Sequence, residues 1–448
     1  MTTDDRQALI DWYDRNRTRT AELFDLLSDE AYYSRPIGLR NPIVFYEGHL
    51  PGFSFNTLVK RGLGQPSIDA KLEDLFARGI DPHESATNAK ARGNEADLWP
   101  SREAVKQFCD EADRQVREAL ASGDIEQAGH PLLDRAQAAF SIIEHEATHL
   151  ETLMYMWHRL PLEQKRRPDG YQPVVGGTPP EQAWVEVLPG RAVLGVDRTE
   201  VPFAWDNECP AYSEDVPAFV IQRHNVTNAA FAEFVAAGGY GEMRWWRPED
   251  WEWVQQEAMT HPIFWERDGA RWLWRGMFDR LPLPESWPVF VSQAEASAYA
   301  RWKGLRLPTE AEYQRAAYGS PDDGRRPYPW GHDAPGSAHG AYDFHSWDPQ
   351  PAGSHSAGQS AWGIHDLVGN GWEWTGTEFG PFPGFTVLPS YPEYSAEFFD
   401  GEHFVLKGAS PVTARELLRP SFRNWFRARY PYMYATFRCV KAAPGAGA

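Results

Sequence analysis

Residues 141–156, with the sequence SIIEHEATHLETLMYM, predict a buried helix that carries two histidines on one face. His145 and His149 are four residues apart, and positions i and i+4 of a helix lie on the same side. That side also carries apolar residues, so it faces protein rather than water: Ala138, Ile142, Leu153 and Met156. Buried imidazoles need a bonding partner, because an unpaired buried polar group costs free energy. We interpret the pair as two ligands of one metal ion.

Two other interpretations of this stretch are open. Backbone carbonyls or carboxylates could satisfy a buried histidine pair without a metal. The letters HEATH also match the H-E-x-x-H signature of zinc hydrolases, in which Glu146 would act as the general base. The extended form of that signature needs a glycine and a third histidine downstream, where Thr152 and Tyr155 stand instead. A third ligand should therefore come from another part of the chain.

Residues 1–165 predict an antiparallel four-helix bundle, because their helical segments are joined by modest loops. Pro131 suits the first turn of the last long helix, which runs to about residue 160. The segments with helical periodicity are residues 5–28, 102–121 and 131–160, with a short helix at 70–78 and a loop at 80–100.

A further helix should begin at Ile43 and place His49 near its middle. Pro51 is an objection, because proline kinks the interior of a helix. Bundle cores often bind metals through ligands on facing helices. His49, in an otherwise apolar stretch, is therefore our candidate for the third ligand.

Residues 161–180, PLEQKRRPDGYQPVVGGTPP, are rich in proline, glycine and charge and predict an interdomain linker. The segments that follow are short and contain many glycines, prolines and tryptophans. Only residues 227–237 and 293–303 predict helices. We expect residues 181–448 to form an α+β domain with much irregular backbone.

Composition excludes several classes of protein. The formal net charge of −19 argues against nucleic acid or an anionic membrane as the main partner. No apolar run reaches the length of a membrane span, and residues 1–18 lack the pattern of a signal peptide. Three scattered cysteines, Cys109, Cys209 and Cys439, are too few for a disulfide framework. These features predict a cytoplasmic location.

Several motifs occur in order in the second half of the chain. They are NVTN at 225–228, RLPTEAE at 306–312, YPWG at 328–331, DLVGNGWEWT at 366–375 and FRC at 437–439. Together they resemble the formylglycine-generating-enzyme (sulfatase-modifying-factor) domain over roughly residues 180–442. The resemblance implies an α+β fold related to C-type lectins. The namesake enzyme uses a cysteine pair near its C-terminus for copper and substrate, whereas the corresponding stretch here contains only Cys439.

The helical half resembles DinB-type bundles, through His49 and the pattern H-x-x-x-H-x-E at residues 145–151. A DinB bundle fused to this second domain is similar to the ergothioneine sulfoxide synthases and their relatives, the selenoneine synthases. That resemblance implies that His49, His145 and His149 bind one non-haem iron(II), Fe(2+). It also implies hercynine (trimethylhistidine), a thiol or selenol donor and O2 as substrates, with C–S or C–Se bond formation at the imidazole.

The same resemblance implies further site residues. The family has an Asn-Trp pair around the trimethylammonium group, and Asn424 and Trp425 match it. A fixed cation without donor hydrogens suits aromatic faces and oxygen acceptors, although Trp425 could also be an ordinary core residue. Family enzymes use a tyrosine near the iron, for which Tyr391 and Tyr394 are candidates. Glu151 is expected to orient a histidine ligand rather than to bind metal.

Three positions depart from the synthases that use γ-glutamylcysteine. Phe426 and Tyr430 stand where those enzymes have an aspartate and an arginine for the charged donor, and Thr148 stands where glutamine is common. A less charged and more aromatic donor pocket suits the ring of a selenosugar. We therefore expect a selenoneine synthase, with an ergothioneine sulfoxide synthase using γ-glutamylcysteine or cysteine as the alternative. The zinc hydrolase and a non-catalytic lectin-like binding protein are alternatives of other classes, and the latter leaves the bundle histidines unexplained.

Overall fold

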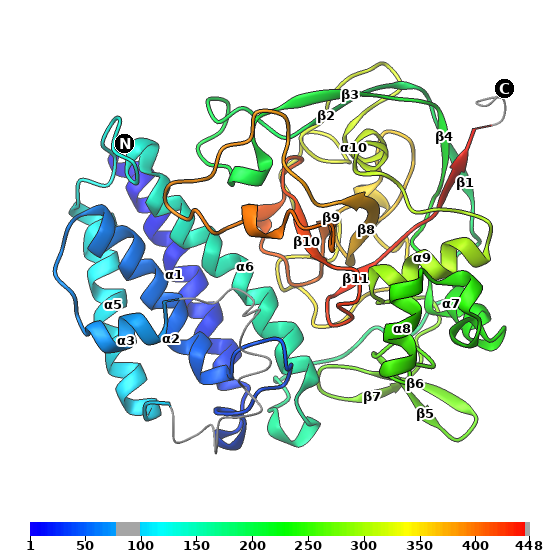
Figure 1. The fold of residues 1–448 in the computed structure, drawn as a ribbon, viewed down its shortest axis with the longest axis horizontal. Helices are drawn as coiled ribbons and strands as arrows, with labels where there is room; N and C mark the ends of the chain where they lie inside the picture. The colour runs from blue at the N-terminus through cyan, green and yellow to red at the C-terminus, as the bar shows by residue number, and fades with distance from the viewer. Residues whose placement is uncertain (78–98, 444–448) are drawn as a thin grey trace. The chain divides into compact units, whose positions relative to one another are not determined.

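The computed structural model describes residues 1–77 and 99–443 and divides into two compact units. The helical unit comprises residues 1–170 together with residues 388–391, and the C-terminal unit comprises the remainder (Figure 1). The loop predicted for residues 80–100 lies mostly outside the described residues. Within the described ranges, no helix is both long and apolar enough to cross a membrane.

The long helices of the helical unit lie side by side, as Figure 1 shows. They are α1 (Thr3–Asp25), α2 (Ile43–Ser54), α5 (Arg102–Ser122) and α6 (Gln137–Arg159), with the short helix α3 (Ala70–Leu75) after α2. Helix α1 contacts α5 and α6, and α2 contacts the same two helices. The predicted four-helix bundle is confirmed.

Helix α1 begins at a capping box and buries one side. The Thr2 hydroxyl accepts a hydrogen bond from the Asp5 backbone N–H at 3.1 Å, and the Asp5 carboxylate accepts one from the Thr2 N–H at 2.8 Å. The buried side follows helical spacing through Leu9, Tyr13, Asn16, Thr20 and Leu23.

Helix α2 continues through Pro51. Proline has no N–H, so the carbonyl of Glu47, four residues earlier, lacks its usual helical partner. The thiol of Cys109 on α5 donates to that carbonyl across 3.3 Å. After Ser54 the helix widens into π-helical turns over Phe55–Gly62. His49 therefore lies in helical backbone despite the proline that follows it.

Helix α6 begins at Gln137, so the prediction of a helix opening at Pro131 is wrong. Arg135 and Ala136 have φ angles of 53° and 55°, in the left-handed region that a continuous α-helix does not allow. The residues before α6 instead form a turn and a short 3₁₀ segment, Asp134–Ala136.

A segment from the second half of the chain, Leu388–Tyr391, belongs to the helical unit. The hydroxyl oxygens of Ser390 and Ser141 lie 2.8 Å apart, and both serines are fully buried. Tyr391 packs against the apolar core of the bundle. This contact joins positions 249 residues apart in sequence, which helical periodicity does not predict.

The C-terminal unit contains several small sheets between short helices, so the predicted α+β class is confirmed. One sheet has the strand order β10–β9–β8–β11, formed by β8 (Gly371–Glu378), β9 (His403–Ala409), β10 (Asn424–Arg427) and β11 (Ala435–Thr436). A second has the order β1–β4–β12, formed by β1 (Trp184–Val187), β4 (Phe219–Gln222) and β12 (Val440–Ala442). The others are the pair β2 (Gly190–Leu194) and β3 (Tyr212–Val216), and the antiparallel β5 (Trp265–Asp268), β6 (Arg271–Arg275) and β7 (Arg280–Pro282).

Both helices predicted in this half are confirmed, as α7 (Asn228–Ala236) and α9 (Gln293–Trp302). The sequence patterns missed α8 (Pro248–Gln256) and α10 (Glu310–Tyr318). Helix α10 starts inside the RLPTEAE motif, where Thr309 and Glu312 form a capping box. The motif therefore specifies a helix start.

A buried ion pair connects two of the other motifs. Arg438 and Glu373 have no exposed surface, and the guanidinium makes hydrogen bonds of 2.7 and 2.6 Å to the two carboxylate oxygens. Arg438 also donates to the carbonyls of Gln222 and His365. The charge is therefore paired and bonded, as a buried guanidinium requires, and it links the end of the chain to β8.

Candidate metal centre

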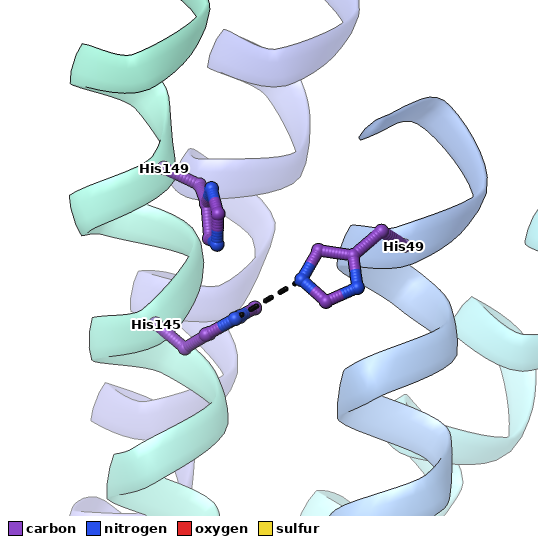
Figure 2. Close-up of side chains that lie close together, drawn as sticks. All are labelled: His49, His145 and His149. Atoms are coloured by element: carbon purple, nitrogen blue, oxygen red, sulfur yellow. Dashed lines mark hydrogen bonds between the residues drawn. The ribbon is translucent and has the colours of Figure 1, made fainter. Parts of the chain in front are cut away.

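Three histidines converge in the core of the helical unit. His49 extends from α2, and His145 and His149 extend from neighbouring turns of α6, with their rings turned toward one another (Figure 2). One ring nitrogen from each lies within 4.8 Å of the corresponding atoms of the other two. The Nε2 atoms of His49 and His145 are 3.3 Å apart. The structure thus brings together the three residues predicted as metal ligands.

Aromatic rings surround two of these imidazoles. Phe53 stacks on His145 with ring centroids 3.7 Å apart and an interplanar angle of 16°. Phe45, one helical turn before His49, stacks on that ring at 4.9 Å and 21°. These contacts restrict rotation of both imidazoles and keep polar partners away from their faces.

All three imidazoles are held in the neutral form. Burial lowers the pKa of His49 to about 4, with the hydrogen bond to Phe76 acting in the opposite direction. Burial, followed by the charges of His149 and His49, holds the pKa of His145 well below its ordinary value. The pKa of His149 is also well below its ordinary value, through burial and then the charges of His49 and Arg40. Neutral imidazole is the form that binds a metal ion.

The donor set fits a catalytic metal ion. Two nitrogens that bind one ion at about 2.1 Å lie about 3.0 Å apart at a right angle and about 3.4 Å apart at a tetrahedral angle. The 3.3 Å between Nε2 of His49 and of His145 falls in this interval. Three protein ligands leave coordination positions for substrates, as in catalytic rather than structural sites. Fully saturated structural sites carry a fourth protein ligand, and within the described residues the cluster comprises these histidines alone.

Glu146 does not serve this cluster. Its Oε1 accepts hydrogen bonds from Arg17 Nη1 at 2.8 Å and from Thr20 Oγ1 at 2.6 Å, both on α1. The residue has no exposed surface. A general base of a zinc hydrolase must reach a metal-bound water, whereas this carboxylate is held in an ion pair between two helices. The geometry therefore gives no support to the zinc-hydrolase interpretation.

The two candidate tyrosines lie in different units. Tyr391 belongs to the helical unit, where its ring centroid is 6.0 Å from that of His145 and 5.0 Å from that of Phe53. Tyr394 belongs to the C-terminal unit and stacks on Trp205 at 4.0 Å. Within the helical unit, Tyr391 therefore lies beside the histidines.

Asn424 and Trp425 lie on β10 in the C-terminal unit. The Trp425 indole stacks on Phe379 at 4.5 Å with an interplanar angle of 1°, and meets Tyr394 edge-on at 5.1 Å. Phe398 lies 5.9 Å away. The Asn424 side-chain oxygen accepts a hydrogen bond from the Trp425 N–H at 2.9 Å. Trp425 is half-buried, so this aromatic cluster is not a sealed core.

Phe426 and Tyr430 stack on each other, with centroids 5.1 Å apart and an angle of 23°. Phe426 follows Trp425 on the same strand, where successive side chains point to opposite faces, and the two rings contact different neighbours.

Thr148 lies on α6 beside His149, and its hydroxyl donates to the Glu144 carbonyl at 2.9 Å. The roles predicted for Phe426, Tyr430 and Thr148 toward a substrate stay predictions.

The sequence patterns missed the hydrogen bond that orients His49. Its Nδ1 lies 2.7 Å from the carbonyl oxygen of Phe76. For His145 and His149, Nδ1 has no hydrogen-bond partner among the described residues, so Glu151 does not orient either ring through that atom. Gly48 could have indicated this contact from the sequence. A glycine inside a predicted helix, directly before a predicted ligand, marks a close approach of another part of the chain.

Two family models match the chain. The model for the sulfatase-modifying factor enzyme 1-like domain matches residues 173–443, and the model for the DinB superfamily matches residues 13–153. A hercynine oxygenase from Mycolicibacterium thermoresistibile is 41% identical over 429 residues, covering 91% of this chain and 89% of that protein.

More distant relatives match as well. Ergothioneine biosynthesis protein 1 from Neurospora crassa is 26% identical over 518 residues, covering 97% of this chain and 57% of that protein. The formylglycine-generating enzyme from Mycobacterium tuberculosis is 31% identical over 290 residues, covering 53% of this chain and 91% of that protein.

A DinB bundle with three convergent histidines, joined to a sulfatase-modifying-factor-like domain, defines a class of two-domain proteins with a metal-binding bundle. Within that class, the chain belongs to the hercynine oxygenase family.

Proposed function

We propose that this protein is an iron(II)- and O2-dependent oxygenase that forms a C–S or C–Se bond at the imidazole of hercynine. The observation that carries the proposal is the convergence of His49, His145 and His149 in a chain of the hercynine oxygenase family. Three neutral imidazoles leave about three open positions on a six-coordinate iron. That number suits a substrate imidazole, a sulfur or selenium donor and O2.

The proposed reaction balances with a thiol donor. The imidazole C–H bond and the donor S–H bond break, and a C–S bond and an S–O bond form. One oxygen atom of O2 enters the sulfoxide and the other leaves as water with the two hydrogens. An iron(II) ion held by the three imidazoles would supply the redox chemistry that couples O2 to these changes.

Tyr391 is the tyrosine that we assign to the reaction. Its ring centroid lies 6.0 Å from that of His145, and the ring packs against the apolar core of the bundle. A tyrosine phenol carries one O–H donor. Its Oη can therefore donate a proton or a hydrogen bond to a reacting group. Tyr394 instead supports the ring cluster around Trp425.

We assign the trimethylammonium group of hercynine to Asn424 and Trp425. A quaternary ammonium ion is recognised by aromatic faces, and Trp425 lies among Phe379, Phe398 and Tyr394. The amide oxygen of Asn424 adds a partial negative charge on the same strand. Thr148, beside His149 on α6, is proposed to contact substrate through its hydroxyl oxygen.

We propose a selenosugar as the donor. Phe426 is half-buried and stacks on the buried Tyr430, and neither side chain carries a charge. An uncharged aromatic pair suits a neutral ring better than the carboxylates of γ-glutamylcysteine. γ-Glutamylcysteine or cysteine is the alternative donor, with the same reaction at hercynine.

Oxygen consumption tests the proposal. Protein loaded anaerobically with iron(II) is mixed with hercynine and, in parallel, with a selenosugar, a thiosugar, γ-glutamylcysteine and cysteine, and products are identified by mass. We expect O2 uptake that requires both hercynine and a donor, with the largest kcat/KM for the sugars. Absence of hercynine-dependent uptake with every donor would rule the proposal out.

A further inference from the structure

Gly48 lies in the interior of α2, directly before His49, where it makes room for another side chain. A Cβ atom at this position would lie 2.5, 2.5 and 2.6 Å from three carbons of the Phe76 ring. Such distances are far inside van der Waals contact, and glycine in a helix interior is destabilising relative to alanine. The glycine is therefore explained by the close approach of Phe76.

Phe76 cannot easily move away from Gly48. Its side chain is fully buried, and its ring contacts Phe108 at 5.9 Å, Phe45 at 6.2 Å and Trp99 at 6.4 Å between centroids. Close-packed side chains yield little when volume is added. A methyl group at position 48 would therefore displace Phe76 as a whole rather than rotate its ring into free space.

The backbone around Phe76 is anchored as well. Phe76 ends the short helix α3, and its N–H bonds to the carbonyl of Leu72 at 3.0 Å. The buried carboxylate of Glu73 in that helix accepts hydrogen bonds from the Ser67 hydroxyl and the Ile68 N–H, both at 2.7 Å. Lys60 pairs with the other oxygen of this carboxylate. These contacts fix α3 relative to α2 and the π-helical turns.

The carbonyl of Phe76 accepts a hydrogen bond from Nδ1 of His49 at 2.7 Å. A carbonyl can only accept, so Nδ1 carries the proton and Nε2 carries the lone pair. That Nε2 is the atom 3.3 Å from Nε2 of His145. Within the described residues, Nδ1 of His145 and of His149 has no such partner.

We propose that Gly48 and Phe76 are positioning residues for His49: the glycine admits the Phe76 ring, and the Phe76 carbonyl then fixes the tautomer and direction of the His49 imidazole before a metal binds. The inference deepens the proposed function, because it concerns the same histidine centre. It does not depend on the identity of the metal or on turnover. His49 is thus oriented before the metal ion binds, and the α6 histidines supply the other two ligands.

Two matched glycine variants test this inference. Gly48→Ala and Gly52→Ala lie one turn apart in the same helix and gain the same helix propensity. A Cβ at Gly52 would meet its nearest atom, in the Phe108 ring, at 3.4 Å, an ordinary contact. Loss of an outer-shell partner typically lowers metal affinity about 10- to 100-fold. We expect a loss of that size in Co(II) affinity, measured by chelator competition, for Gly48→Ala and less than about twofold for Gly52→Ala.

The tautomer provides a second readout that needs no metal. In protein with ¹⁵N-labelled histidine, the protonated Nδ1 of His49, assigned with His49→Ala, should be present in the wild type and in Gly52→Ala. It should be lost or exchanged for the other tautomer in Gly48→Ala. The double variant Gly48→Ala with Phe76→Leu has a smaller side chain above position 48 and should recover both the signal and most of the Co(II) affinity.

The inference is wrong if Gly48→Ala matches Gly52→Ala in both Co(II) affinity and the Nδ1 proton signal. It is also wrong if the double variant folds but recovers neither property. Should Gly48→Ala fail to fold, the double variant alone decides between these results. A failure of the proposed function gives another result. In that case wild-type protein would bind Co(II) and show the His49 tautomer, yet consume no O2 with hercynine.

Discussion

Arg17 Nη1 lies 2.8 Å from Glu146 Oε1, in an ion pair that joins α1 to the histidine-bearing helix α6. The same guanidinium contacts Asp113 on α5 through Nε at 3.1 Å, and Tyr13 donates to that aspartate at 2.6 Å. The glutamate of the H-E-x-x-H match is therefore part of a network that connects three helices of the bundle.

Glu146→Gln should lower stability and leave catalysis largely intact. The amide retains an acceptor for Thr20 but loses the charge that pairs with Arg17. Hydrogen bonds to charged groups contribute about 1.5–3 kcal/mol, so urea unfolding should show a loss of about that size. Iron content and turnover should stay within a few fold of wild type. A loss of turnover by several orders of magnitude with iron retained would restore Glu146 as a base.

Tyr391→Phe should slow turnover with hercynine by about 10²-fold or more, the range typical of a lost proton donor. Iron content should be unchanged, because the phenol is not one of the three ligands. Tyr394→Phe is the matched control, since it keeps the stacking on Trp205 and should change turnover by less than about threefold. Equal effects of the two changes on kcat would remove the assignment to Tyr391.

The donor preference should follow charge at positions 426 and 430. A bidentate arginine–carboxylate contact is a strong, charge-assisted interaction, and its absence should cost a charged donor about 1.5–3 kcal/mol, or about 10- to 100-fold in affinity. Wild-type protein should therefore prefer a selenosugar or thiosugar over γ-glutamylcysteine in kcat/KM. Phe426→Asp combined with Tyr430→Arg should shift that preference toward γ-glutamylcysteine. Efficient use of γ-glutamylcysteine by the wild type, with the sugars ignored, would refute the proposed donor.

Stability of the C-terminal unit should fall at mildly acidic pH through His224. Burial, and then the charges of His365, Arg438 and Arg223, lower the pKa of His224 to about 4. The unfolded chain, with a pKa of about 6.5, binds a proton that the folded state does not. The contribution of neutral His224 to the free energy of unfolding is therefore complete above pH 6.5 and is lost as the pH falls toward 4.

This group alone should make the protein about 2 kcal/mol less stable at pH 5 than at pH 7. Urea unfolding followed by tryptophan fluorescence measures the difference. Between pH 7 and pH 5, the free energy of unfolding should fall less in His224→Gln than in the wild type, by about that amount. If wild type and variant lose the same stability over this interval, His224 is not kept neutral by the fold.

The local sequence pattern was sufficient to predict the part of the site that lies on one helix. The spacing of His145 and His149 predicts their common face, since helical geometry is set by neighbours in sequence. The start of α6 was misplaced because Arg135 and Ala136 adopt left-handed backbone, which residues other than glycine rarely adopt and which composition does not reveal.

Other features depend on contacts between distant segments. Our assignment of Tyr391 rests on the membership of residues 388–391 in the helical unit, which sequence periodicity does not predict. The Phe76 carbonyl is a backbone atom whose identity leaves no mark in the sequence, apart from the glycine at position 48 that admits its ring.

The iron content of three single histidine variants tests the central claim most directly. Wild-type protein reconstituted anaerobically with iron(II) and desalted should retain one iron per chain. His49→Ala, His145→Ala and His149→Ala should each retain almost none while keeping the helical circular dichroism, and His332→Ala, at an exposed position, should match wild type. Full iron occupancy in His49→Ala would contradict the account, because the metal would then be bound without the ligand that α2 supplies.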